Sequence, residues 1–186
     1  LDSSVFGKNI FSGIRIIIYG KPNSGKSSLF NAILGHDRAI TSSIPGTTRD
    51  TVEAWFELEG IPVCLIDTAG IWEPEKHLDN LGVEKTLSEL KHADICLLVD
   101  EKDPSSLLDP AFNKKFKHHY IMVKTKLDLD RSPLIKRNNT IATSSINNIG
   151  IKKLLTSLST YISENISVPD RSAMVLITQQ QRKLLA

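Results

Sequence analysis

Short apolar runs alternate with amphipathic segments along most of the chain. The run from Ile14 to Tyr19 is almost continuously apolar and is bounded by glycines, which is typical of a parallel strand buried on both faces. Apolar positions in 27–34 recur on one face of a helix. Alternation over 51–58, the turn residues Glu59-Gly60 and the apolar run 62–66 together predict a hairpin.

The second half of the chain continues this alternation. We expect helices at 81–92, 105–117 and 149–163, and strands at 95–99, 119–123 and 140–143. Strands that alternate with helices predict an α/β fold, with a mostly parallel six-stranded sheet and helices on both faces. The sequence has no internal repeat and no low-complexity segment.

The two ends of the chain differ from its middle. Residues 1–12 have no clear period, and the short helix pattern in 178–185 stops soon after it begins. A length of 186 residues fits one domain, given roughly 100–200 residues per domain. We therefore predict a folded domain at 13–165, an N-terminal flank at 1–12, and a linker with the start of a helix at 166–186. A helix cut short suggests a domain excised from, or inserted between, other parts.

Composition and charge place few limits on function. The chain is 40% hydrophobic and 24% charged, as in ordinary globular domains. A formal net charge of +2 is too small to indicate nucleic acid or membrane by itself. The basic stretch 114–119 is interpreted as a solvated helix end rather than a site for a polyanion.

The two cysteines, Cys64 and Cys96, lie in separate apolar runs. They lack the spacing of metal ligands, and two unpaired thiols suit a reducing compartment. We interpret both as small core residues of strands. No apolar stretch reaches the ~18 residues of a membrane span, and no signal peptide is visible. A cytoplasmic protein without membrane association is expected.

The strongest chemical pattern begins at Gly20. Residues 20–27 read GKPNSGKS, follow a predicted strand and open a predicted helix, as in phosphate-binding P-loops. Glycines let the backbone curl so that its amides face phosphate oxygens, and the helix N-terminus adds a favourable dipole. Lys26 is expected at the β- and γ-phosphates, while Ser27 offers its hydroxyl to magnesium. A glycine-rich turn that binds nothing is the weaker interpretation.

Two further segments complete a phosphate and magnesium site. Asp67-Thr68-Ala69-Gly70 follows a strand, so Asp67 faces the crevice where α/β sheets bind ligands and can hold the magnesium shell. The backbone amide of Gly70 can contact the γ-phosphate and move when that phosphate leaves. In 46–50, which reads GTTRD, Thr48 is the hydroxyl expected to cap magnesium when the γ-phosphate is present.

The base is predicted to be guanine. The sequence Thr125-Lys126-Leu127-Asp128 stands where this architecture usually has Asn-Lys-x-Asp. A carboxylate at Asp128 can accept both hydrogens of the N1 and amino groups of guanine, and adenine lacks that donor pair. Lys126 can lay its stem along the base, and Thr125 in place of asparagine costs some support for the pocket. A backbone amide of residues 143–145 can meet the guanine oxygen.

These motifs resemble the GTPase domain of the MnmE (TrmE) family of tRNA-modifying GTPases. The resemblance runs from about Gly13 to about Ser163 and rests on GKPNSGKSSL at 20–29, IPGTTRD at 44–50, DTAGI at 67–71, LGVEKT at 81–86 and Ala93-Asp94. The Der (EngA) family of ribosome-assembly GTPases has nearly the same first two motifs. The stretch after Gly70 and the truncated helix favour MnmE.

The resemblance implies a Ras-like P-loop NTPase fold and a set of ligands. The implied guanine-nucleotide ligands are Asn23, Ser24, Gly25, Lys26, Ser27, Ser28, Thr47, Thr48, Asp67, Gly70, Thr125, Lys126, Asp128, Ser144 and Ser145. Magnesium is assigned to Ser27, Thr48 and Asp67. Family members insert this GTPase domain in a helical domain, which would make residues 1–12 a remnant of that domain.

The resemblance also implies how the whole protein acts. Family members hydrolyse GTP when two GTPase domains face each other as a homodimer, with potassium as activator. The full-length protein works with MnmG, FAD and a folate to modify the wobble uridine of certain tRNAs. A folate-binding domain and a C-terminal cysteine motif are absent from this sequence, so the chain is expected to hydrolyse GTP without modifying tRNA.

Potassium and water activation depend on particular positions. Asn23 holds the place of the family's potassium-binding asparagine, and Ser42, Ile44 and Thr47 correspond to the rest of that site. A cation beside the phosphates would supply the charge that other GTPases supply with an arginine.

The expected catalytic residues are Asp79, Thr48 and Gly70. Ile71 cannot orient water as glutamine does, and Asp79 stands where the family has a glutamate. Aspartate is one methylene shorter, and a shift of about 1 Å can cost on the order of 100-fold in rate. Either Asp79 reaches the water, or a nearby glutamate (Glu73, Glu75 or Glu84) replaces it, or hydrolysis is slow. A GTP-binding switch with negligible turnover is therefore an alternative function.

Residues outside these motifs have simpler interpretations. His36, His77 and His92 are interpreted as surface residues rather than ligands. Trp55 lies on an alternating strand and is expected to be packed. Trp72 follows the Asp-Thr-Ala-Gly motif, where core packing and contact with a partner are equally supported.

Overall fold

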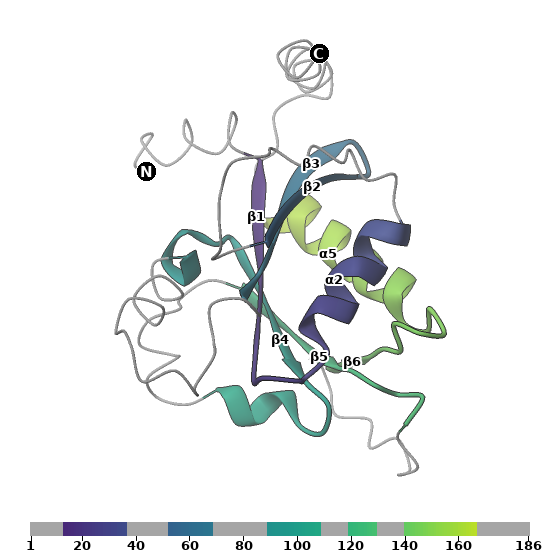
Figure 1. Cartoon of the computed structure of the whole chain (residues 1–186). Coiled ribbons are helices and arrows are strands. Elements are labelled where there is room, and N and C mark those ends of the chain that lie inside the picture. Colours follow the sequence, from purple (N-terminus) through teal and green to yellow (C-terminus); the bar gives the residue numbers. More distant parts are fainter. Residues whose placement is uncertain (1–12, 37–51, 69–88, 109–118, 130–139, 167–186) are drawn as a thin grey trace.

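A computed structural model describes residues 13–36, 52–68, 89–108, 119–129 and 140–166. These residues build one six-stranded sheet (Figure 1), in the order β2-β3-β1-β4-β5-β6. The strands are β1 (Ile14–Gly20), β2 (Val52–Leu58), β3 (Ile61–Asp67), β4 (Ile95–Asp100), β5 (His119–Lys124) and β6 (Thr140–Ala142). All neighbours pair in parallel except β2 and β3, which form an antiparallel hairpin. The predicted mostly parallel α/β sheet is confirmed.

The strand register brings functional segments to one edge of the sheet. In β1, Ile18 is paired with Asp67 of β3, and Gly20 is paired with Val99 of β4. Parallel strands end on the same side, so the segments that follow β1, β3, β4 and β5 meet at their carboxyl edge. This edge is at the bottom of Figure 1, where β1 turns into α2 (Lys26–His36).

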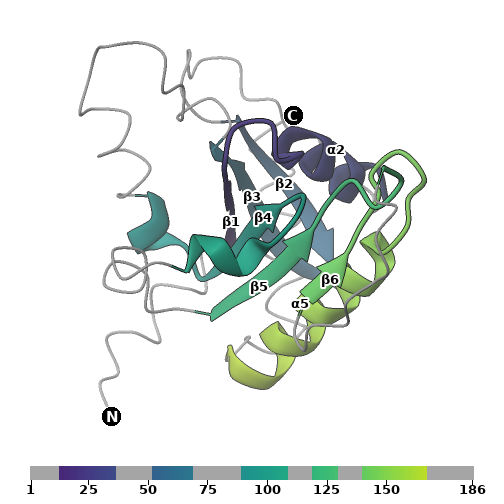
Figure 2. The same cartoon turned by 90° about the horizontal axis from the view of Figure 1, so that it is seen from below.

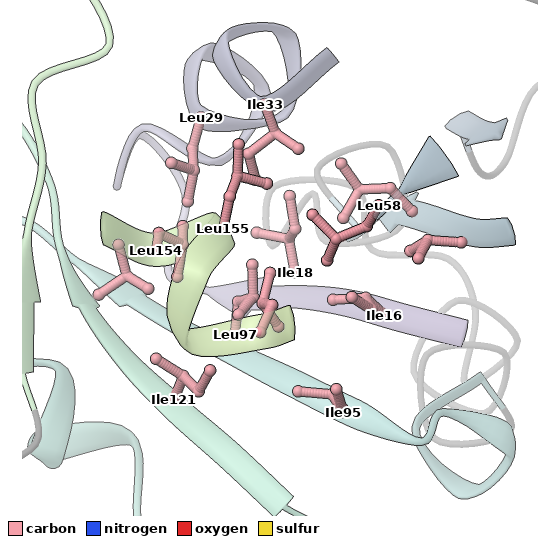
Figure 3. Close-up of a cluster of buried hydrophobic side chains, with 14 of the residues drawn as sticks. Ile16, Ile18, Leu29, Ile33, Leu58, Ile95, Leu97, Ile121, Leu154 and Leu155 are labelled. Carbon is pink, nitrogen blue, oxygen red and sulfur yellow. The ribbon is translucent and has the colours of Figure 1, made fainter. Parts of the chain in front are cut away.

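The larger core lies between the sheet and two helices. Helices α2 and α5 (Ile151–Asn165) cover the same face, as the two perpendicular views show (Figures 1 and 2). Figure 3 shows side chains from both helices meeting those of the strands. Fully buried members include Ile16, Ile18, Leu29, Ile33, Leu97 and Leu154. Each such side chain contributes roughly 1.5–3 kcal/mol on burial, so α2 is held firmly beside the carboxyl edge.

The opposite face carries a smaller core. Its buried side chains come from the strands, from Leu90 in the helical turn 89–92, and from Leu107 in the 3-10 helix η2 (Pro104–Leu107). Cys64 and Cys96 belong to this cluster, as the sequence predicted. Burial raises the pKa of both thiols, to about 12 for Cys64, so both act as apolar core residues. The packing predicted for Trp55 is confirmed by its contact with this core.

Two predicted helices begin differently in the structure. The helix expected from residue 105 starts as the 3-10 turn η2, because the Asp103 carboxylate accepts the Ser105 N–H (3.1 Å) and Leu108 leaves the helical region at φ −82° and ψ 64°. The rest of that prediction, 109–118, lies outside the described residues. Helix α5 begins at Ile151, because Ser144 and Ile149 form a β-bridge before Gly150 turns the chain.

None of the helices in the described ranges has the length and apolar character needed to cross a membrane.

Candidate nucleotide site

The loop between β1 and α2 has the backbone of an anion cradle. Gly25 and Asn23 take left-handed conformations, with φ +89° and +60°, which turn successive amides toward the inside of the loop. A Cβ atom on Gly20 would overlap the Val99 carbonyl oxygen, so the start of the loop requires glycine. No acidic residue occupies the first turn of α2, leaving its positive dipole end available to a phosphate.

Lys26 brings a buried ammonium group into this loop. Its side chain is 4% exposed, and Nζ donates to the Lys21 carbonyl oxygen at 2.7 Å. Burial lowers the pKa of Lys26, while the carboxylate of Asp67 acts in the opposite direction. Because the loop itself holds the ammonium, a phosphate oxygen can take over its contact with little rearrangement. The role predicted for Lys26 fits this position.

Ser27 and Asp67 are the two residues predicted to hold magnesium that the structure describes. Asp67 ends β3 and is 3% exposed, and Ser27 is an exposed residue in the first turn of α2. The Thr68 hydroxyl donates to the Ile18 carbonyl oxygen at 2.7 Å, which fixes the end of β3 against β1. In the described ranges no group of three or more His, Cys, Asp or Glu could hold a metal. One hydroxyl and one carboxylate fit magnesium, which keeps water and phosphate ligands.

Hydrogen bonds also order the segments for which the sequence predicts contacts with the base. The Ser144 hydroxyl donates to Oδ1 of Asp128 at 2.5 Å, and the buried Thr143 accepts the Leu127 N–H through its carbonyl oxygen at 3.0 Å. Asp128 itself is exposed. Ser144 thus orients the carboxylate and leaves its other lone pairs for a base. The sequence predicted these residues together but not the bond between them.

Thr125 joins the base-reading segment to the phosphate loop. It is 2% exposed, and its hydroxyl donates to the Ser24 carbonyl oxygen at 2.6 Å. Its N–H donates to the carbonyl oxygen of Asp100 at 3.1 Å. Thr125 therefore ties the phosphate loop and the end of β4 to the segment that contains Asp128, a role that the sequence indicated only as a loss relative to asparagine.

Lys126 and its surroundings form the rim of the site. Lys126 has φ +55°, and Nζ lies 2.7 Å from Oε2 of Glu101. Glu101 was not identified from the sequence, because an exposed glutamate after a strand carries no distinguishing pattern. Leu129, which directly follows Asp128, is 72% exposed, and Ile146, two residues after Ser144, is 81% exposed. The rim therefore combines an ion pair with exposed apolar side chains.

The structure gathers the phosphate and base motifs at one edge of the sheet. Ser28 is exposed in the first turn of α2, and Ser145 is partly buried beside Ser144. Six predicted site residues lie outside the described residues: Ser42, Ile44, Thr47, Thr48, Gly70 and Asp79. The surface positions predicted for His36 and His92 are confirmed. His77 and Trp72 lie outside the described ranges.

Comparisons with known proteins agree with this geometry. Residues 15–127 match the family described as 50S ribosome-binding GTPase. The tRNA modification GTPase MnmE of Trichodesmium erythraeum is 39% identical over 160 residues, which cover 80% of this chain and 34% of that protein. MnmE of Clostridioides difficile is 32% identical over the whole chain and 42% of its own length. The chain thus spans about a third to two fifths of these relatives.

Solved structures show the same fold. The crystal structure of an Era variant from Aquifex aeolicus bound to GDP·AlF4− is 27% identical, with a TM-score of 0.57. The match covers 80% of this chain and 56% of that one.

Proposed function

The chain belongs to the GTPase family described as 50S ribosome-binding GTPase, and we propose that it is the GTP-hydrolysing domain of a tRNA-modifying GTPase of the MnmE kind. One observation carries the proposal: 80% of the chain aligns at 39% identity with the MnmE of Trichodesmium erythraeum. The preformed phosphate loop and the oriented Asp128 carboxylate support GTP as its ligand.

The residues of this chain divide the work of binding and hydrolysis. Lys26 would contact the β- and γ-phosphates, and the amides of residues 23–28 would surround them. Ser27 and Asp67 would hold magnesium, together with Thr48. Bound magnesium neutralises charge that develops on the phosphates during transfer. Lys126, Asp128 and the amides of Ser144 and Ser145 would fix the guanine base.

Potassium activation is a second part of the proposal. Asn23 is exposed at the tip of the phosphate loop, where an amide oxygen is free to meet a cation, and Ser42, Ile44 and Thr47 would complete the site. Asn23→Ala should then remove the stimulation of GTP hydrolysis by potassium while GDP binding is kept. Equal wild-type rates in potassium and sodium at matched ionic strength would contradict the potassium site.

Hydrolysis requires a residue that orients water. We assign this role to Asp79, with Thr48 and Gly70 at the γ-phosphate. Asp79→Ala should lower potassium-stimulated turnover without changing nucleotide affinity. Glu73→Ala, Glu75→Ala and Glu84→Ala test the three alternative glutamates and should leave turnover unchanged. Unchanged turnover in Asp79→Ala would refute the assignment.

Dimerisation through the GTPase domains would make turnover depend on protein concentration. Single-turnover hydrolysis should therefore accelerate as the chain is concentrated in potassium. Negligible turnover at every concentration would instead identify a GTP-binding switch.

The tRNA substrate is tested in the organism that carries the gene. A cytoplasmic partnership with MnmG would lead to modified wobble uridine in certain tRNAs. A chromosomal Lys26→Ala substitution should then deplete that nucleoside in digested total tRNA, measured by mass spectrometry, with exposed Lys152→Ala as control.

A ribosome-directed function is the second candidate, because the family description itself names 50S binding. This Der-like alternative predicts that Lys26→Ala leaves the tRNA nucleosides unchanged and accumulates incomplete 50S particles in sucrose gradients. The two measurements on the same strain separate the candidates.

A further inference from the structure

Glu101 places a carboxylate at the rim of a site built for a polyanion. Its Oε2 lies 2.7 Å from Nζ of Lys126, and Lys126 directly follows Thr125, whose hydroxyl contacts the phosphate loop. A carboxylate here adds negative charge to the rim of a site that we propose binds phosphates, which is unfavourable for binding. The unfavourable charge calls for a compensating role, and the ion pair with Lys126 supplies one.

The backbone that carries Glu101 is fixed. Oδ1 of the buried Asp100 accepts the N–H groups of Lys102 at 2.8 Å and Asp103 at 2.9 Å. The Asp100 carbonyl oxygen accepts the Thr125 N–H. These bonds hold residues 100–103 against the segment that contains Lys126, so Glu101 extends from an ordered loop.

The backbone of Lys126 is fixed as well. Its carbonyl oxygen accepts the Leu129 N–H at 2.9 Å, and the next residue donates its N–H to Thr143 at 3.0 Å. These backbone bonds do not restrict the long side chain of Lys126, whose four methylenes can take many rotamers. The contact with Glu101 fixes the end of that side chain.

We propose that Glu101 is a positioning residue for guanine binding, because it holds Nζ of Lys126 and thereby keeps the aliphatic stem of Lys126 extended as one wall for the base. The proposal rests on the proposed function, which makes a guanine nucleotide the ligand. A stem held in place before binding loses less conformational freedom when the base packs on it. Glu101 acts through Lys126 and does not itself contact the nucleotide.

A positioning role for Glu101 and a purely electrostatic effect predict opposite changes in GDP affinity for Glu101→Gln. The side chains of Lys126 and Glu101 are 34% and 42% exposed, so solvent screens the pair and its effect is modest. If Glu101 only repels phosphates, Glu101→Gln tightens GDP binding. If it positions Lys126, Glu101→Gln weakens GDP binding by about two- to five-fold, the range of exposed ion pairs.

A double-mutant cycle tests the proposal with GDP as the probe. Dissociation constants are measured by calorimetry for the wild type, Glu101→Gln, Lys126→Ala and the double variant. Weaker binding in Glu101→Gln should disappear in the Lys126→Ala background. Glu57→Gln is the matched control, because Glu57 is an exposed carboxylate on the outermost strand β2, three strands away from β4 in the sheet.

Each other outcome overturns a defined statement. Unchanged or tighter binding in Glu101→Gln refutes positioning, and weakening that persists without Lys126 refutes its route through Lys126. A wild-type chain that fails to bind GDP overturns the proposed function itself. Binding by the wild type with an inert Glu101→Gln overturns the positioning role alone.

Discussion

Thr125 occupies the position where this architecture usually has asparagine, and its hydroxyl joins this segment to the phosphate loop. Thr125→Val keeps the shape but leaves the Ser24 carbonyl oxygen without the bond it accepts at 2.6 Å. An unsatisfied buried polar group costs about 1–3 kcal/mol. We therefore expect lower thermal stability and weaker GDP binding, measured by calorimetry. Thr125→Ser keeps the hydroxyl and should retain most of both, and equal loss in the two variants would contradict the role of this bond.

Individual residues differed in how far the sequence could predict them. The roles proposed for Lys26 and Ser27 rest on spacing alone, because each position of a phosphate loop has its own expected role. The contact between Thr125 and Ser24 spans 101 positions, and that between Lys126 and Glu101 spans 25. Such contacts depend on the order of strands in the sheet, which alternation of apolar and polar residues does not specify.

At the scale of elements, two glycines provide a matched comparison. A Cβ on Gly20 would overlap the Val99 backbone, whereas a Cβ on Gly35 in α2 meets nothing within 4 Å. Gly20→Ala should push β1 away from β4, lower the midpoint of urea unfolding and abolish nucleotide binding. Gly35→Ala should raise helix stability by about 0.5–1 kcal/mol. A Gly20→Ala chain as stable as the wild type would contradict the close approach of these strands.

The contact between β5 and α5 leads us to predict that the stability of the domain depends on pH. His119 stacks on Tyr161 with ring centroids 3.7 Å apart, and desolvation by burial lowers the pKa of His119 below 6.5. The folded state then binds fewer protons than the unfolded chain below pH 6.5, so this residue reduces stability as the pH falls. His119→Phe keeps a stacked ring without the proton. As the pH falls below about 6.5, its free energy of unfolding in urea titrations should fall less than that of the wild type.

If the two titrations run parallel, the imidazole does not contribute to acid sensitivity. His92→Phe is a control, because His92 is exposed.

The sequence predicted the bounds of strands most accurately where the strand is buried and therefore continuously apolar. The strands β1, β3 and β4 were all found within one residue of their predicted ends, since each is a buried apolar run. Helix starts were less predictable. The 3-10 turn η2 depends on the carboxylate of Asp103, and the start of α5 depends on a bridge between Ser144 and Ile149. Both are local hydrogen-bond choices that hydrophobic periodicity does not encode.

At the scale of the whole molecule, the nucleotide site joins elements from across the sheet. The phosphate loop follows β1, Asp67 ends β3, and Asp128 and Ser144 follow β5 and β6. A ligand that contacts all of these segments binds only the folded chain. Its binding therefore stabilises the whole folded domain against unfolding. The order of the strands explains why the described residues of the candidate site lie together.

Because the site is formed only in the folded chain, a bound nucleotide should raise the melting temperature by an amount that depends on its base and on Lys26. A ligand at about 100 times its dissociation constant adds about 2.7 kcal/mol of stability, which is roughly 5–10 °C for a domain of this size. GDP with magnesium should raise the melting temperature, measured by calorimetry, and ADP should not, because Asp128 faces an unmatched base edge. Lys26→Ala should lose the shift, and exposed Lys152→Ala should keep it. Equal shifts with GDP and ADP would refute base reading by Asp128, because phosphate binding alone would then account for the stabilisation.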